Sequence, residues 1–147
     1  MNSSRQRQAF TLVEMLLVIA IISILAAMAI SNFSNASHDT RSVVARQQLA
    51  VVQEAVNHWT NREIGRVTTS GGIGKSVSQV MSNYNSKNTA QLRYDLFKSY
   101  LDEATASSLT VDTSTGRITS QAMRDVSMYL TLPDWAGASY PKVQLLP

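Results

Sequence analysis

The chain has 147 residues, of which 44% are hydrophobic and 16% charged, and it contains no cysteine. This length suits one domain of ordinary size. The lack of cysteine excludes a disulfide scaffold, a thiolate metal site and catalysis by a cysteine nucleophile. The formal net charge is +3 and comes without a cluster of Lys and Arg. We therefore expect no nucleic-acid partner.

An apolar segment at residues 10–33 follows a short basic stretch at residues 1–9. Its one charged residue is Glu14. As a helix the segment would be roughly 36 Å long, enough to cross a hydrocarbon core of about 30 Å. Arg5 and Arg7 precede it and no acidic residue accompanies them. This asymmetry predicts that the N-terminus stays inside and that the residues after the segment lie outside.

Three interpretations of this segment are open from composition. It is a plain single-pass anchor, or a cleavable secretory signal whose Ala27-Met28-Ala29 has the small-x-small form that signal peptidases accept. In the third interpretation Glu14 has a function, because a carboxylate inside a spanning helix costs about 2.5–3.5 kcal/mol and needs a partner. The segment holds no Lys, Arg or His. The partner is then water, another chain, or a new amino terminus at Phe10.

Residues 5–33 closely resemble the N-terminal segment of type IV pilins and type II secretion pseudopilins. The features in common are a short basic leader, a small residue, the run Phe10-Thr11-Leu12-Val13-Glu14 and a long apolar stretch. The resemblance implies cleavage by a prepilin peptidase between Ala9 and Phe10, N-methylation of Phe10, and extraction from the inner membrane into a helical filament. In that filament, Glu14 would contact the Phe10 amine of an adjacent subunit.

Two positions depart from the family pattern. Ala9 stands where the family usually has Gly; it should still fit a small-residue pocket, with slower processing. Ser31 stands where the family often has Pro, so no proline kink is expected there. The residues that follow are also weak helix formers, and we expect a soft point in the helix over residues 31–35.

A helical pattern resumes after residue 35. Apolar residues recur at intervals of three and four, at Ala45, Leu49, Val52, Val56 and Trp59. Gly65 supplies a stop signal. We therefore expect a leader at residues 1–9, an assembly helix at 10–33, its amphipathic continuation at 34–64, and a globular head at 65–147.

The head is predicted to be α+β, with helices in its first half. Residues 65–89 are turn-rich and polar, which predicts a long connection with one or two helical turns near residues 76–81. An apolar stripe predicts a short helix over residues 90–104.

Strands are predicted in the second half of the head. A hairpin is expected, with strands at residues 109–111 and 117–119 around a turn at 112–116. Further strands are expected at 128–132 and, as an edge strand between prolines, at 141–146. Three or four antiparallel strands would then cover the apolar stripe of the long helix, giving an α+β fold.

No catalytic constellation is found in the sequence. His38 and His58 do not have the spacing of metal ligands. Gly74-Lys75-Ser76 is similar to the end of a phosphate-binding loop, but Thr69 stands where that motif requires glycine. The serines have no assignable base and acid. We therefore expect no enzyme.

A calcium site is the one cofactor that the family resemblance raises, because some secretion pseudopilins carry one in their C-terminal loops. Asp112, Asp125 or Asp134 would supply its ligands in this chain. The sequence has no dense run of Asp and Asn to support such a site. We therefore expect no cofactor.

The sequence thus predicts a structural subunit of a pilin-like filament. The resemblance implies that its partners are copies of itself, other pilin-like subunits, a prepilin peptidase and an inner-membrane assembly platform. It would cross the bacterial inner membrane once, with a cytoplasmic N-terminus, an extracytoplasmic head and a filament in the periplasm or at the cell surface. The missing disulfide favours a type II secretion pseudopilin over a type IV or competence pilus subunit. A secreted or membrane-anchored binding domain is the alternative from another class.

Overall fold

The computed structural model describes residues 10–65, 74–137 and 139–147, except for the side chains at positions 31, 32, 34 and 35. The chain divides into two compact units, Met1–Ser37 and His38–Pro147. Helix α1, Leu12–Gly65, contributes to both units, and the surroundings of its two parts differ. The leader expected at residues 1–9 lies outside the described residues.

The N-terminal part of α1 is apolar on every side. The stretch Leu12–Ile30 is long and apolar enough to cross a membrane. Its large apolar side chains are all exposed, from 47% at Val18 to 76% at Leu12. Ser23 Oγ donates to the Ile19 carbonyl at 2.6 Å, which satisfies this hydroxyl within the helix. The backbone stays helical at residues 31–35, and the side chains at the four weak positions there are outside the description.

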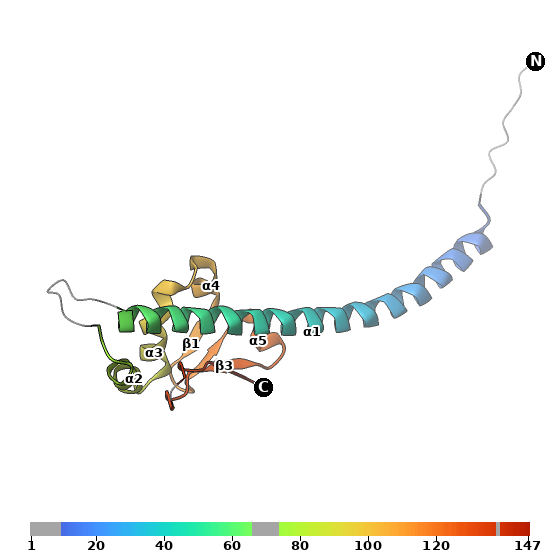
Figure 1. Cartoon of the computed structure of the whole chain (residues 1–147). Coiled ribbons are helices and arrows are strands. Elements are labelled where there is room, and N and C mark those ends of the chain that lie inside the picture. The colour runs from blue at the N-terminus through green and yellow to red at the C-terminus, as the bar shows by residue number, and fades with distance from the viewer. Residues whose placement is uncertain (1–9, 66–73, 138) are drawn as a thin grey trace, which may run out of the picture. The chain divides into compact units, whose positions relative to one another are not determined.

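The C-terminal part of α1 supplies the central face of the core in the second unit (Figure 1). The predicted stripe is confirmed at Ala45, Val52, Val56 and Trp59, which are at most 4% exposed. Leu49 is half-buried and packs against the same core. Burial of this stripe, rather than helix propensity, stabilises this part of α1.

Four short strands form one antiparallel sheet in the order β1-β2-β3-β4. The strands are β1 Thr110–Asp112, β2 Arg117–Thr119, β3 Tyr129–Thr131 and β4 Gln144–Leu146. Paired residues line one face, because Val111 lies opposite Ile118, Ile118 opposite Leu130, and Leu130 opposite Leu145. Ile118 and Leu130 are buried in the core that contains the α1 stripe, and Val111 and Leu145 are partly buried and pack against it. The α+β prediction, the hairpin and the edge strand before the last residue are confirmed.

The hairpin turn depends on one carboxylate and one glycine. Asp112 Oδ1 accepts hydrogen bonds from the Ser114 and Thr115 backbone N–H groups at 2.8 and 3.3 Å. Gly116 has φ +71°, a left-handed conformation that glycine adopts without strain, and its N–H donates to the Asp112 carbonyl at 2.9 Å. The local sequence therefore fixes the register of β1 and β2.

The helices of the head differ from the prediction in extent and number. They are α2 Val77–Asn85, α3 Ala90–Phe97, the 3-10 helix η1 Lys98–Tyr100, α4 Glu103–Ser108 and α5 Gln121–Asp125. Helix α2 is longer than the expected turns at 76–81, because Val80 and Tyr84 are both buried and extend its packed face.

The single helix expected over residues 90–104 is confirmed over Ala90–Phe97, but its predicted extent is wrong. Helix α3 stops at Phe97, and Asp102 starts α4 by accepting from the Thr105 backbone N–H at 2.8 Å. Helix α5 was not predicted. Ser120 caps it by accepting from the Met123 N–H at 3.3 Å, and Met123 is fully buried. A helix of five residues is too short to produce a periodic pattern, so only the cap marked its start.

Candidate assembly site

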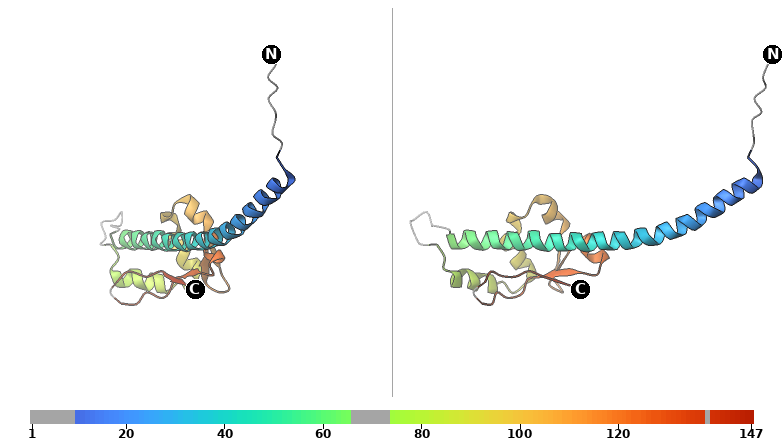
Figure 2. Two further views of the ribbon diagram at one scale, coloured as in Figure 1. Left: turned by 90° about the vertical axis from the view of Figure 1, so that its right-hand side faces the viewer. Right: turned by 45° about the vertical axis from the view of Figure 1, so that its right-hand side comes forward.

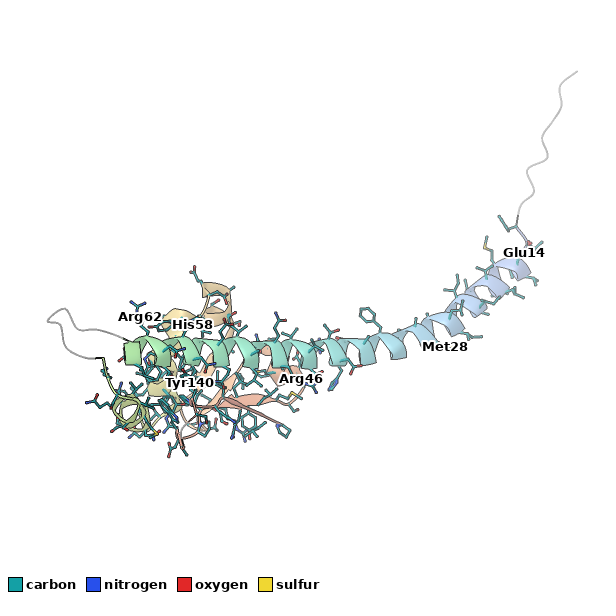
Figure 3. All side chains as sticks on the ribbon, in the orientation of Figure 1. Glu14, Met28, Arg46, His58, Arg62 and Tyr140 are labelled. Carbon is teal, nitrogen blue, oxygen red and sulfur yellow. The ribbon has the colours of Figure 1, made fainter. Side chains whose placement is uncertain are left out.

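Glu14 lies at the start of α1, where it forms a reciprocal capping box with Thr11 (Figure 3). The Thr11 backbone N–H donates to Glu14 Oε2 at 3.1 Å, and the Glu14 N–H donates to Thr11 Oγ1 at 3.2 Å. The Thr11 hydroxyl also lies 3.3 Å from Glu14 Oε2. This pattern satisfies two backbone donors that the helix leaves without partners at its N-terminus.

The capping box also reduces the isolation of the carboxylate. Glu14 receives hydrogen bonds from its own chain and lies near the positive end of the helix dipole. The segment contributes no cation, since no Lys, Arg or His lies between Phe10 and Ser37. A cationic partner for Glu14 must therefore come from outside the side chains of this segment.

Phe10 precedes the capping box and its side chain is 74% exposed. Ala9, the residue expected before the cleavage point, lies outside the described residues. Sequence analysis singled out Glu14 and Phe10 but did not assign a role to Thr11. The sequence did indicate this capping role, because Thr11-x-x-Glu14 has the spacing of a capping box before an apolar run.

In the sequence, two basic residues at positions 5 and 7 precede the Thr11–Glu14 capping box and the exposed apolar helix. Residues 4–30 match the family model described as the prokaryotic N-terminal methylation motif. The chain carries the signature of type IV pilin-like proteins. No curated protein and no solved structure matches the chain. The pilin-like assignment therefore comes from the motif and covers the N-terminal segment.

The alternative interpretations of the segment were a cleavable secretory signal and a plain single-pass anchor. Ala27-Met28-Ala29, the small-x-small run, lies inside α1, and Met28 is 65% exposed there. The motif marks a structural rather than an enzymatic family. A candidate membrane-spanning helix and the motif together fit a membrane-anchored protein.

The histidines lie on α1 in separate surroundings. His58 Nε2 is 3.5 Å from Glu54 Oε1, one helical turn away, and both side chains are largely exposed. His38 is exposed at the start of the second unit. Within the described residues, no three His, Asp or Glu side chains are grouped as metal ligands would be.

The three aspartates considered for calcium have different partners. Asp112 is held by the hairpin turn, and hydrogen bonds from Ser114 and Thr115 keep its pKa well below the usual range. Asp125 Oδ2 is 3.3 Å from Arg41 Nε, and Asp134 forms an ion pair with Arg93. The structure does not gather these three carboxylates into one site.

The run Gly74-Lys75-Ser76 has a structural role in the head. Ser76 caps α2, accepting from the Gln79 N–H while the Gln79 side chain accepts from the Ser76 N–H. Lys75 forms an ion pair with Glu63 near the end of α1. These contacts give Lys75 and Ser76 structural roles that need no bound phosphate.

Proposed function

We propose that this chain is a non-enzymatic subunit of a pilin-like filament. The observation that carries the proposal is the methylation motif at residues 4–30. In the proposal, a prepilin peptidase cleaves between Ala9 and Phe10, and the new Phe10 amine is methylated. The mature chain then resides in the inner membrane through Leu12–Ile30 until it is assembled.

The exposed apolar helix supports polymerisation as the end state. Its large apolar side chains are exposed, and in the proposal lipid covers them before assembly and other copies cover them afterwards. Moving such helices from lipid into a bundle retains their apolar surroundings. A buried carboxylate then needs a cation, and the Phe10 amine of an adjacent copy supplies one beside Glu14.

We assign the filament to type II secretion, as a pseudopilin that helps to drive protein export. The lack of cysteine supports this branch, because the disulfide of many adhesive pilins cannot form. A type IV or competence pilus subunit remains the second candidate. Genes for an assembly ATPase and an outer-membrane secretin beside this gene, together with secreted enzymes rather than surface pili, would support the secretion assignment.

Mass spectrometry of the mature N-terminus tests the processing step. The proposal expects a chain that begins with N-methylated Phe10. A chain beginning at Ile30 would identify a secretory signal, and an unprocessed Met1 would identify a plain anchor; either result contradicts the proposal.

Substitution of Glu14 tests the assembly step. Glu14→Val should insert into the membrane normally and fail to form filaments, because only the pairing between copies is lost. Glu14→Asp is the matched control, since it keeps the charge while shortening the side chain. Normal filament yield from Glu14→Val would rule out the assembly role of Glu14, while leaving the processing result unchanged.

A further inference from the structure

The loop at residues 132–143 joins β3 to β4 and packs closely on the head. The structure describes all of it except residue 138, and the described part contains no helix or strand. Trp135 and Val143 are at most 8% exposed, and Pro141 is fully buried. Figure 2 shows this loop and α2 on the same side of α1 in both views. A loop that is buried in this way depends on contacts that satisfy its polar backbone groups.

Arg93, on α3, holds the first part of the loop with its guanidinium group. Nη1 donates to the Leu132 carbonyl at 2.5 Å, and Nη2 forms an ion pair with the Asp134 carboxylate. Nε donates to the Lys87 carbonyl at 2.8 Å, in the connection between α2 and α3. The same group lies 5.1 Å from the centre of the Tyr84 ring. One cation therefore joins oxygen atoms of two separate segments and lies against an aromatic ring.

The surroundings of Arg93 set it apart from the other arginines that the structure describes. Its side chain is 11% exposed. The others are all exposed, and they are Arg41, Arg46, Arg62, Arg117 and Arg124. A guanidinium group keeps its charge when it is covered, so its N–H groups need acceptors there. The loop supplies two of the acceptors, the Leu132 carbonyl and the Asp134 carboxylate.

The carbonyl oxygens further along the loop also accept from side chains. The Trp135 carbonyl accepts from Asn85 Nδ2 at 3.0 Å, and the Pro141 carbonyl accepts from Gln53 Nε2 at 2.9 Å. The Ser139 carbonyl accepts from the indole N–H of Trp135. Side chains of α1, α2 and α3 therefore hold the loop through its oxygen atoms.

The donor atoms of the loop do not fit the calcium site that the family resemblance raises. A pocket of about 270 Å³ lies along the loop. Calcium takes about six to eight oxygen ligands, with carboxylates among them. Asp134 is the only carboxylate that lines this pocket, and it is paired with Arg93. Lys142 lines the same pocket and brings a positive charge, which disfavours a divalent cation.

We propose that the Arg93 guanidinium is an internal cation that orders the loop at residues 132–143, so that this loop needs no divalent metal ion. A cation that is part of the chain is not lost on dilution or to a chelator, whereas a bound ion stabilises only in proportion to its concentration. The conformation of the loop then depends on the packing of α3 and not on the calcium concentration. The proposal concerns the head alone and does not depend on the filament function.

Calcium and a chelator test the proposal on the unsubstituted full-length chain in detergent. Urea unfolding, followed by the fluorescence of Trp59 and Trp135, should give the same midpoint in EDTA and in calcium chloride at equal ionic strength. A metal ion that binds only the folded head would raise the midpoint as its concentration rises. A midpoint that rises in calcium chloride and falls back in EDTA would overturn the proposal.

Substitution of Arg93 tests the cation itself through hydrogen exchange of the Trp135 amide. Arg93→Met keeps a long side chain and removes the charge and the donors, so this amide should exchange at least about tenfold faster. Arg93→Lys keeps the charge without the planar fork and should give an intermediate rate. Arg62→Met is the matched control, because this arginine on α1 is exposed and its loss should leave the rate unchanged. The buried Val52 amide reports whether the head stays folded.

Each outcome supports or overturns the internal cation. Faster exchange of the Trp135 amide in Arg93→Met, with Val52 still protected and Arg93→Lys intermediate, supports it. If Arg93→Met leaves Trp135 protected, the other side chains hold the loop and the proposal is wrong. If Arg93→Lys exchanges as fast as Arg93→Met, the charge does not order the loop and the proposal is also wrong. If Arg93→Met unfolds the whole head, the comparison of EDTA with calcium chloride decides. The mature N-terminus tests the filament function separately.

Discussion

The two parts of α1 are built from similar apolar residues and have opposite surroundings. Phe33, in the first unit, is 80% exposed, whereas Trp59, in the second unit, is 4% exposed. The second part is covered by the head's own strands and helices. The first part has no such cover within the described chain. An apolar helix that is exposed in this way fits a membrane anchor, because lipid can cover its side chains.

The largest effect that separates the two units is expected from a pair of phenylalanines. Phe97 is fully buried, with an edge-to-face contact to Tyr94 at 5.5 Å between ring centres. Phe97→Ala should lower the free energy of unfolding of the head by about 3–5 kcal/mol. Phe33→Ala, the same change in the exposed part, should alter it by less than about 0.5 kcal/mol.

Urea unfolding of the full-length chain in detergent, followed by the fluorescence of Trp59 and Trp135, measures both variants. Both tryptophans lie in the core of the head, so they report its unfolding and not the state of the apolar helix. A large effect of Phe33→Ala would show that the two units are energetically coupled, and the comparison between them would no longer hold.

The second effect is alkaline destabilisation of the head. Burial raises the pKa of Tyr84 to about 12, with Arg93 opposing and Asp134 reinforcing the shift. An unfolded tyrosine ionises near pH 10. The stability that this group contributes is therefore complete below pH 10 and is lost as the pH rises from about 10 to 12, by up to about 3 kcal/mol.

Urea unfolding at pH 8 and pH 11 measures about half of this loss, because pH 11 lies about one unit above the unfolded pKa. Tyr84→Phe is the control because it removes the ionising group and keeps the ring. The difference in the free energy of unfolding between pH 8 and pH 11 should be smaller in Tyr84→Phe than in the unsubstituted chain. Burial and Asp95 also raise the pKa of Tyr94, so a remainder is expected. If Tyr84→Phe loses as much stability between pH 8 and pH 11 as the unsubstituted chain, another group of the head causes the loss.

Periodicity predicted the parts of the head that are long or regular. The α1 stripe and the alternation around Ile118 and Leu130 each mark one buried face, and each was predicted correctly. The break between α3 and α4 was not, because the apolar pattern continues through Leu101 while the Asp102 cap starts a new helix. Short helices are decided by caps and tertiary packing, which a periodic pattern does not contain.

The candidate assembly site was predicted in part. The cost of a charge in an apolar segment identified Glu14, but its partner Thr11 required the capping geometry.

A third, smaller effect concerns the attachment of the last strand to α1. The Gln53 amide accepts from the Val143 N–H at 2.8 Å and donates to the Pro141 carbonyl at 2.9 Å. Gln53→Ala leaves both backbone groups without this partner and should destabilise the head by about 2 kcal/mol. Gln47→Ala, on the exposed face of the same helix, should have almost no effect.

Hydrogen exchange of the Val143 amide distinguishes a local from a general loss in Gln53→Ala. The Val143 N–H should exchange faster, because its acceptor is removed, while the buried Val52 amide keeps its protection until the head unfolds. Unchanged protection of Val143 would mean that Gln53 does not hold the strand.

The smallest effect is expected from removing an N-terminal helix cap, which can be compared between the two units. Thr89 caps α3 by accepting from the Leu92 N–H at 3.3 Å, and Thr11 caps α1 by accepting from the Glu14 N–H at 3.2 Å. Thr89→Ala should lower the free energy of unfolding of the head by about 1 kcal/mol. Thr11→Ala removes an equivalent hydrogen bond at the exposed start of α1, which belongs to the other unit, so the unfolding of the head should not change. Its effect should be confined to faster amide exchange within the first turn of α1 in detergent, because fraying there is local. If Thr11→Ala instead lowered the stability of the head as much as Thr89→Ala does, the exposed part of α1 would be held by the head, and it would not be free to serve as a separate packing surface for other copies.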